Sequence, residues 1–162
     1  MSEEISTEWL NDRSDFQMNF IHGRANPIGL HLQYTLDGGV ISTVWTPTDQ
    51  HVGFPGHAHG GLTSAVLDDT MGRLSVLYGD WTVTARIEVR YRLPVLVGIA
   101  YRVEASVERR TSRGLTARGS MSNGTEVVAT AKALYVSLPE RVRDNSIQAW
   151  PEFARYLDGH RG

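Results

Sequence analysis

Two adjacent acids, Asp68 and Asp69, lie within an otherwise largely apolar stretch and have different neighbours at helical spacing. Asp69 has Arg73 four residues later, an order that favours an ion pair on a helix. Asp68 has Ser64 and Gly72 at the corresponding positions and no cation. A carboxylate in such a stretch needs compensation, either as a satisfied structural group or as a working one. We therefore expect Asp69 to form a structural pair and Asp68 to be the candidate reactive carboxylate.

The segment before these acids, HVGFPGHAHGG, ends in two consecutive glycines, Gly60 and Gly61. Glycines that open a helix leave its first N–H groups exposed. Together with the positive end of the helix dipole, those groups suit an anion or a developing oxyanion. The alternative interpretation is a flexible turn and helix cap.

Three histidines in the same segment, His51, His57 and His59, raise the question of a metal site. A pair of the form HxH is a weak motif without a carboxylate held nearby, and local spacing fixes none here. We therefore expect no metal, and we expect His59 to pack and form hydrogen bonds at the helix start.

From Gly60 to about Tyr78, apolar residues recur at intervals of three and four, which predicts one helix of about five turns. Small residues share one face of this helix with a single acid, in the order Gly61, Ser64, Ala65, Asp68 and Gly72. Gly60 and Asp68 are separated by about 12 Å along one helix, so they cannot both contact one carbonyl carbon. If both act in one reaction, each site combines the helix start of one subunit with the Asp68 of another. An antiparallel, two-fold pairing of two copies would generate two such sites.

Period-two alternation dominates most of the remaining chain and predicts strands. It is clearest in TARIEVRYRLP, where one face holds Ala85, Ile87, Val89, Tyr91 and Leu93 and the other holds Thr84, Arg86, Glu88, Arg90 and Arg92. YRVEASVER and VVATAKALYV follow the same pattern, and the turn at Asp37-Gly38 predicts a hairpin between GLHLQYTL and VISTVWT. An apolar helix among antiparallel strands is covered when the sheet encloses it. We predict an α+β fold, a curved antiparallel sheet wrapped around one long central helix at about 60–78.

Length and composition favour one globular domain and exclude several partners. The chain has 162 residues, 41% of them hydrophobic, and we divide it into a polar arm at 1–15, a domain at 16–140 and a peripheral C-terminal helix and tail at 141–162. A formal charge of -2 gives no field that would attract nucleic acid or an anionic membrane. The absence of cysteine removes disulfides, thiolate ligands and a cysteine nucleophile. Without an apolar N-terminal run, we expect neither a signal peptide nor a membrane span, and a cytoplasmic protein.

The run PGHAHGGLTSAVLDDTMG resembles the central motif of hotdog-fold acyl-CoA thioesterases of the phenylacetate-degradation (PaaI-like) type, within the 4-hydroxybenzoyl-CoA thioesterase superfamily. NPIGL near the start and TARIEVRYRLPVLVG after the helix agree with it, so that the similarity spans roughly residues 19–139. The resemblance implies a hotdog fold. It also implies that the Gly60 N–H polarises a thioester carbonyl, that Asp68 of the facing subunit is the base or nucleophile, and that Thr84 orients the attacking water. From alternation alone, Thr84 is an ordinary surface residue.

The sequence also departs from the family pattern at three positions. Related enzymes often carry Asn or Gln seven residues before the first glycine of HGG, as a second donor to the thioester oxygen, and here that position is Gly53. Another group such as His57, or a water molecule, would have to take that role. Relatives with a CxxC-like segment before NPxGL have cysteines where this chain has Asn19 and His22.

Taken together, the residues and the resemblance predict an acyl-CoA thioesterase that acts as a homodimer or homotetramer, with coenzyme A as part of the substrate and no separate cofactor. The expected substrate contacts are His59, Gly61, His57, Phe54 and Arg92. The alternative is a non-catalytic hotdog protein that binds or senses acyl-CoA. A fatty-acid-synthesis type dehydratase is set aside, because the positions fourteen residues after His51 and His57 are Ala65 and Met71 rather than glutamate.

Overall fold

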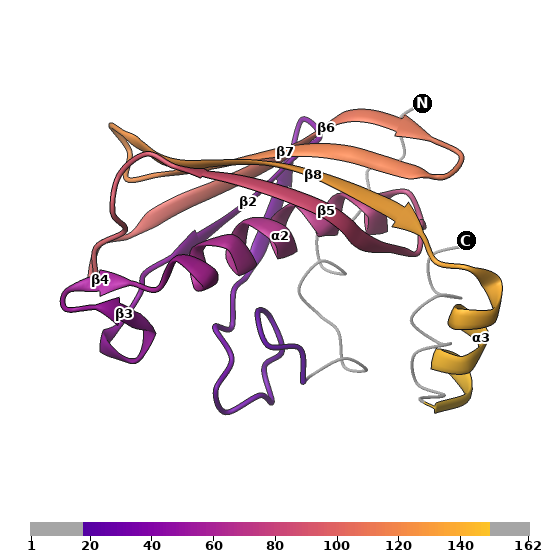
Figure 1. Ribbon diagram of the computed structural model, residues 1–162, viewed down its shortest axis with the longest axis horizontal. Helices are drawn as coiled ribbons and strands as arrows, with labels where there is room; N and C mark the ends of the chain where they lie inside the picture. Colours follow the sequence, from indigo (N-terminus) through magenta and orange to yellow (C-terminus); the bar gives the residue numbers. More distant parts are fainter. Residues whose placement is uncertain (1–17, 150–162) are drawn as a thin grey trace.

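A computed structural model describes residues 18–149, in which one long helix lies against a broad antiparallel sheet (Figure 1). The strands are β1 (Tyr34–Asp37), β2 (Val40–Trp45), β3 (Val52–Phe54), β4 (His57–Ala58), β5 (Thr82–Tyr91), β6 (Tyr101–Thr111), β7 (Gly114–Ser122) and β8 (Val127–Ser137). The helices are the short η1 (Asp49–His51), α2 (Gly60–Leu77) and α3 (Glu140–Ala149). The predicted arm at 1–15 lies outside the described residues, as does the part of the predicted C-terminal helix and tail after residue 149. None of the helices within 18–149 has the length and apolar character needed to cross a membrane.

The main sheet has six strands in the order β1-β2-β6-β7-β8-β5, and every neighbouring pair is antiparallel. Strands β1 and β5 are therefore its two edges. Helix α2 lies along one face, under β5 to β8 in the view of Figure 1. This is the predicted α+β arrangement, and α2 occupies the predicted range. The small hairpin of β3 and β4 was not predicted and leads directly into α2.

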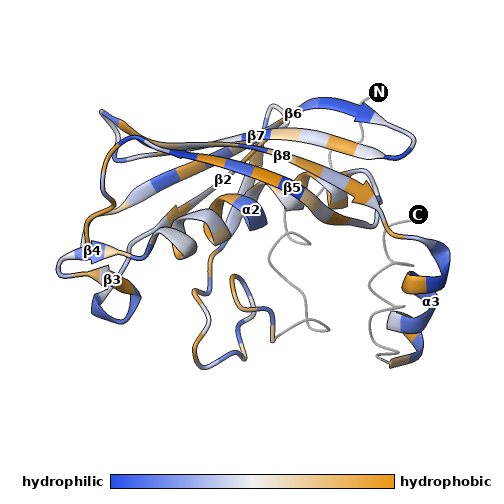
Figure 2. Cartoon of the chain, viewed as in Figure 1, coloured by the Kyte–Doolittle hydropathy of each residue, from blue (hydrophilic) through white to orange (hydrophobic). Residues whose placement is uncertain are grey.

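The apolar stripe of α2 is fully covered by the sheet. Its central side chains Val66, Leu67, Met71 and Leu74 are all 0% exposed. Burial of each contributes about 2 kcal/mol relative to an exposed position. The close approach depends on Gly119 of β7, where an added Cβ would lie 3.1 Å from the Met71 Cγ. Figure 2 shows the alternation of hydrophilic and hydrophobic segments along the strands that cover the helix.

The first hairpin forms where the sequence predicts it, but its first strand is shorter. Gly38 and Gly39 both have positive φ, 54° and 81°, as a two-residue turn between twisted strands requires. Strand β1 begins at Tyr34, because the preceding residues bond elsewhere: the N–H groups of Leu30 and Leu32 donate to the carbonyls of Phe20 and Ile21.

Strand β5 contains a β-bulge that corrects one prediction. Thr84 pairs with Tyr135 and Arg86 pairs with Leu134, so Ala85 is an extra residue in the ladder. Strict alternation predicts that Thr84 faces away from Ala85 and Ile87. With the extra residue, Thr84 and Ile87 both face α2, and Ala85 is exposed.

The predicted pair of Asp69 and Arg73 is part of a larger network on α2. The Arg73 Nε lies 3.5 Å from Asp69 Oδ2, and the same oxygen accepts hydrogen bonds from the Tyr34 hydroxyl at 2.6 Å and from His22 Nδ1 at 3.3 Å. Burial alone would raise the pKa of Asp69, but the His22 hydrogen bond, the Arg73 charge and the Tyr34 hydroxyl lower it from 3.8 to about 2. The network fastens α2 to β1 and to the segment around His22. His22, at a cysteine position of the relatives, thus has a structural contact here.

We expect Asp69→Asn to lower the free energy of unfolding by about 3 kcal/mol at pH 7, because Arg73 would remain buried beside a neutral group. The folded pKa of Asp69 lies below its unfolded value of 3.8, so its stabilisation is present above that pH and is lost as the pH falls towards about 2. The wild type should therefore lose about 2 kcal/mol of its advantage over Asp69→Asn between pH 4 and pH 2. Urea denaturation at pH 7, 4 and 2 measures this difference.

Asp80→Asn is the matched control, because Asp80 pairs with Arg110 at the surface and should cost less than about 1 kcal/mol. An Asp69→Asn protein whose stability follows that of the wild type from pH 7 to pH 2 would contradict the assignment.

Candidate active site

Asp68 is half-buried on α2 and is held by hydroxyl groups rather than by a cation. The Tyr135 hydroxyl lies 2.8 Å from Asp68 Oδ1, and the Thr84 hydroxyl lies 3.0 Å from Oδ1 and 3.2 Å from Oδ2. The ion pairs within residues 18–149 do not include Asp68. The two hydroxyls supply the compensation that an acid on an apolar helix requires.

Tyr135 reaches Asp68 from β8 because α2 has a glycine at the crossing point. A Cβ added to Gly72 would meet the Tyr135 ring at 3.4 Å, so the ring lies directly on the helix surface. The Tyr135 hydroxyl is also 2.8 Å from the main-chain oxygen of Asp68. Burial, together with the negative charge of Asp68, raises the pKa of Tyr135 well above its usual value. The phenol therefore keeps its proton and stays a donor.

Two residues of the predicted line on α2, Ser64 and Asp68, face strand β5. Ser64, one turn before Asp68, forms a short hydrogen bond with the Tyr91 hydroxyl, which also donates to the Gly60 carbonyl at 2.8 Å. Because β5 is an edge strand, this side of the helix is open, and Tyr91 is 53% exposed. Asp68 and Thr84 lie on the same open side.

The helix start presents one amide whose hydrogen atom is available. His59 is the N-cap residue of α2, and its Nδ1 accepts a hydrogen bond of 2.9 Å from the Gly61 N–H. The Gly60 N–H makes no hydrogen bond with any of residues 18–149. Since His59 Nδ1 is an acceptor, the proton of the neutral ring is on Nε2. The helix start therefore offers the Gly60 N–H as a donor, and the exposed His59 ring carries an Nε2–H that is a second candidate donor.

Gly60 and Asp68 are the first and ninth residues of α2, so the amide and the carboxylate are about 12 Å apart in one chain. The structure brings Asp68 together with Thr84, and it places Gly60 with His59 and Gly61 at the other end of that helix face. Within one chain, therefore, the two predicted groups lie too far apart to contact one carbonyl carbon.

The other expected substrate contacts lie nearer to the helix start than to Asp68. Phe54 is 69% exposed, and its ring lies 5.6 Å from the His57 ring. The His57 Nδ1–H donates to the Pro55 carbonyl at 2.8 Å, which leaves Nε2 as an acceptor in the neutral ring. Arg92 follows β5 with an exposed side chain, and its N–H donates to the Val128 carbonyl at 2.8 Å.

The three histidines before α2 bind separate partners. His51 Nδ1 accepts from the Thr48 N–H at 2.9 Å in the cap of η1, and burial lowers the pKa of His51. His57 and His59 make the contacts described above. Within residues 18–149, no three His, Cys, Asp or Glu residues converge as a metal site would require.

Position 53, where related enzymes often carry a side-chain donor, has no room for a side chain in this protein. A Cβ at Gly53 would lie 2.8 Å from the His59 Cα and 2.9 Å from its Cδ2, closer than two carbon atoms can pack. The β3–β4 hairpin thus packs its backbone directly against the helix cap. Any side chain at position 53 would displace His59.

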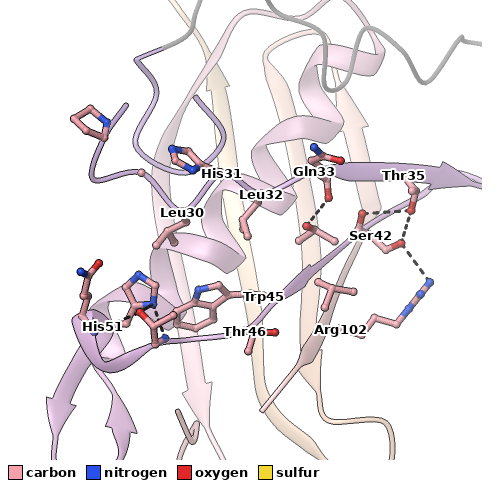
Figure 3. A pocket seen from close by; sticks show the side chains of 16 residues that line it. Leu30, His31, Leu32, Gln33, Thr35, Ser42, Trp45, Thr46, His51 and Arg102 are labelled. Atoms are coloured by element: carbon pink, nitrogen blue, oxygen red, sulfur yellow. Dashed lines mark hydrogen bonds between the residues drawn. The ribbon is translucent and has the colours of Figure 1, made fainter. Parts of the chain in front are cut away.

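A separate hollow of about 720 Å³ lies beside β2, towards the opposite edge of the sheet from β5 (Figure 3). Its lining includes Leu30, Trp45, His51 and Arg102, and no carboxylate. It contains none of the residues that the sequence singles out for catalysis. The hollow therefore offers no carboxylate that could act as a base or as a nucleophile, and we place the candidate active site at Asp68.

Sequence reasoning missed Tyr135 and Tyr91 as parts of the site. Both fall on inward-facing positions of predicted strands, where a phenol needs a hydrogen-bond partner. That need was a usable signal, but the partner could not be named, since it lies 67 residues away for Tyr135 and 31 for Tyr91.

Comparisons with known proteins agree with this architecture. The sequence model of the thioesterase superfamily family matches residues 55–130. No curated protein sequence is significantly similar to the chain. Protein RHA08564, a thioesterase superfamily protein, superposes with a TM-score of 0.70 at 22% identity, covering 81% of this chain and 66% of that one. A phenylacetic acid degradation-related protein from Ralstonia eutropha JMP134 has a TM-score of 0.61 at 26% identity, covering 66% and 85%. A Streptococcus mutans UA159 protein bound to acetyl CoA has a TM-score of 0.62 at 16% identity, covering 66% and 88%.

The steric role of Gly53 can be tested by Gly53→Ala. We expect a loss of about 1 to 3 kcal/mol in the free energy of unfolding, because the added methyl group must push the His59 backbone away. Urea denaturation measures the loss. Gly60→Ala is the control for stability, since its Cβ would meet nothing closer than 3.6 Å. Equal stability of both variants and the wild type would contradict this steric role, because it would show that the β3–β4 hairpin moves away from His59 at no cost in free energy.

Proposed function

Because this chain has the hotdog fold and resembles the PaaI-like thioesterases in sequence, we propose that it hydrolyses an acyl-CoA or related acyl thioester to a free acid and a thiol. The observation that carries the proposal is the half-buried Asp68, held by the Thr84 and Tyr135 hydroxyls on the open side of α2. The acetyl CoA bound to the Streptococcus mutans relative supports acyl-CoA as the substrate class.

The separation of the Gly60 amide and Asp68 within one chain calls for a second copy of the chain. The Gly60 amide of one subunit and Asp68 of its partner would meet if two α2 helices lay antiparallel across a two-fold axis. The edge strand β5 supports this pairing: no described strand covers its outer side, and it borders the face that carries Asp68 and Ser64. An uncovered strand edge presents unpaired N–H and C=O groups to a partner.

In the proposed reaction, the thioester oxygen accepts hydrogen bonds from the Gly60 N–H and the His59 Nε2–H. These donors stabilise the negative charge that develops on that oxygen. The His59 ring replaces the side-chain donor that Gly53 cannot supply. His57 is unsuited to this role, because its Nδ1–H is already donated to Pro55.

Asp68 then acts as base or nucleophile. As a base, it takes a proton from a water molecule whose oxygen bonds to the carbonyl carbon, and Thr84 orients that water. The tetrahedral oxyanion collapses, the C–S bond breaks, and the thiolate leaves with the proton returned from Asp68. As a nucleophile, Asp68 itself would displace the thiolate, and water would hydrolyse the resulting anhydride. We assign Gly61, Phe54 and Arg92 to substrate contacts around the helix start.

Hydrolysis is tested by following thiol release from a panel of acyl-CoAs with the purified full chain. We expect Asp68→Asn, Asp68→Ala and Asp68→Glu each to lower kcat/KM by at least about 100-fold. Near-normal turnover in all three would remove Asp68 from the mechanism. A wild type that binds acyl-CoA without releasing thiol would instead support the alternative, a binding or sensing protein.

Gly60→Pro tests the oxyanion donor with little disturbance of the fold. Proline is favoured at the first position of a helix, and His59 already has the extended backbone, φ -61° and ψ 130°, that proline prefers before it. The substitution removes only an N–H that has no partner among the described residues. We expect kcat to fall by about 100- to 1,000-fold with unchanged thermal stability. Unchanged kcat would exclude the Gly60 amide as the donor.

Mixing the Gly60→Pro and Asp68→Asn proteins tests whether each site is shared between subunits. After denaturation and refolding of an equal mixture, half of the dimers are mixed, and each mixed dimer has one intact site. Activity should return to about one quarter of the wild-type value, although each variant alone is inactive. If activity does not return in a mixture that forms dimers, each site belongs to a single chain.

A further inference from the structure

We propose that Tyr135 is a positioning residue that holds Oδ1 of Asp68, so that Oδ2 is the oxygen that takes the proton or attacks the thioester. The inference rests on the proposed function and extends it to a residue on another strand. It also assigns distinct tasks to the two oxygens of one carboxylate.

The first support is the unequal hydrogen bonding of the two oxygens. Oδ1 lies 2.8 Å from the Tyr135 hydroxyl and 3.0 Å from the Thr84 hydroxyl, whereas Oδ2 has Thr84, at 3.2 Å, as its one partner within the described part of the chain. A carboxylate oxygen with two donors is less available to a proton than one with a single long contact. The side of Asp68 that carries Oδ2 is therefore the reactive one.

The second support is the rigidity of the donor. Tyr135 is 2% exposed, and its ring lies on the surface of Gly72, so the phenol has little freedom to turn away. Its hydroxyl also lies 2.8 Å from the main-chain oxygen of Asp68, which ties it to the same turn of α2. The raised pKa of Tyr135 keeps the proton in place. The phenol thus fixes the carboxylate without itself exchanging a proton.

The third support is the register of β5 and β8. Tyr135 and Thr84 are directly opposite each other in the ladder, and the extra residue Ala85 turns Thr84 inwards. The cross-strand pair brings two hydroxyl groups of the sheet to the Asp68 carboxylate on α2. Thr84 is exposed while Tyr135 is buried, so the solvent-facing side of this pair of hydroxyls is the Thr84 side.

Asp69 provides a built-in control, because it too accepts a hydrogen bond from a buried tyrosine, Tyr34, at 2.6 Å. The two tyrosines are alike in burial and in chemistry: Tyr34 is 1% exposed and Tyr135 is 2% exposed. Tyr34 serves the structural acid, and Tyr135 serves the proposed reactive one. Removal of each hydroxyl should therefore have a similar effect on stability and a different effect on turnover.

The test compares Tyr135→Phe with Tyr34→Phe in the full chain, with thiol release from an acyl-CoA as the assay and urea midpoints as the measure of stability. We expect Tyr135→Phe to lower kcat by about 10- to 100-fold with KM within about 2-fold of the wild type. Tyr34→Phe should keep kcat within about 2-fold while losing a comparable amount of stability. In an Asp68→Ala background, Tyr135→Phe should add no further loss, because it acts through Asp68.

The outcomes separate this inference from the proposed function. If Asp68→Ala is inactive but Tyr135→Phe turns over like the wild type, Tyr135 has no positioning role and the proposed function stands. Equal losses of kcat in the two phenylalanine variants would reduce Tyr135 to a structural residue. Normal activity of Asp68→Ala would overturn both proposals. Should Tyr135→Phe fail to fold, Thr84→Val decides, because Thr84 is the only donor to Oδ2 among residues 18–149. We expect Thr84→Val to lower kcat more than Thr84→Ser does, and equal activity of the two contradicts the assignment of Oδ2.

Discussion

The structure depends on how a negative charge is accommodated on a helix that the sheet covers. A carboxylate removed from water must recover its hydrogen bonds within the protein. Helix α2 carries two such groups in succession, and the fold treats them differently. Asp69 receives a cation and two further donors on the side of β1, whereas Asp68 receives two hydroxyls on the side of β5. The ion pair ties the helix to the sheet, whereas Asp68 has hydroxyl groups and no cation as partners within residues 18–149.

Local sequence features predicted the elements and the structural ion pair of Asp69, whereas the reactive role of Asp68 stays a prediction. The helix at about 60–78, the hairpin after Asp37 and the pairing of Asp69 with Arg73 all depend on residues a few positions apart, and the structure confirms them, with Gly38 and Gly39 rather than Asp37 and Gly38 as the two loop residues. What failed depends on contacts between distant segments. Nothing local reveals that Ala85 is an extra residue in the ladder, so strict alternation alone puts Thr84 on the wrong face, whereas the resemblance already predicts it near Asp68. Likewise, Tyr135 was predicted to lie in a strand, but its partner on α2 was not predicted.

The helix start shows how a missing side chain can be understood from packing. Gly53 departs from the pattern of related enzymes, and its backbone lies against His59 with no space for a Cβ. The same close contact holds the His59 ring over the first turn, where it caps the Gly61 amide and leaves the Gly60 amide without a partner among the described residues. The Gly61 amide is thus satisfied, and the Gly60 amide just before it is left for a ligand. That arrangement is the basis on which we assign the oxyanion donor in the proposed reaction.

The bulge in β5 has a consequence for anyone who would transplant this site or align its relatives. Downstream of Ala85, the ladder with β8 would look the same if that residue were deleted, because each later pair from Arg86 to Tyr91 keeps its partner. Upstream, Thr84 would also stay opposite Tyr135 in that case, whereas a regular strand that keeps Ala85 and pairs it with Tyr135 would turn the Thr84 hydroxyl away from α2. A graft that copies the full residue order onto a strand without the bulge would inherit the helix and its acid yet lose the hydroxyl. In this strand, the register with β8 decides which hydroxyl reaches the helix.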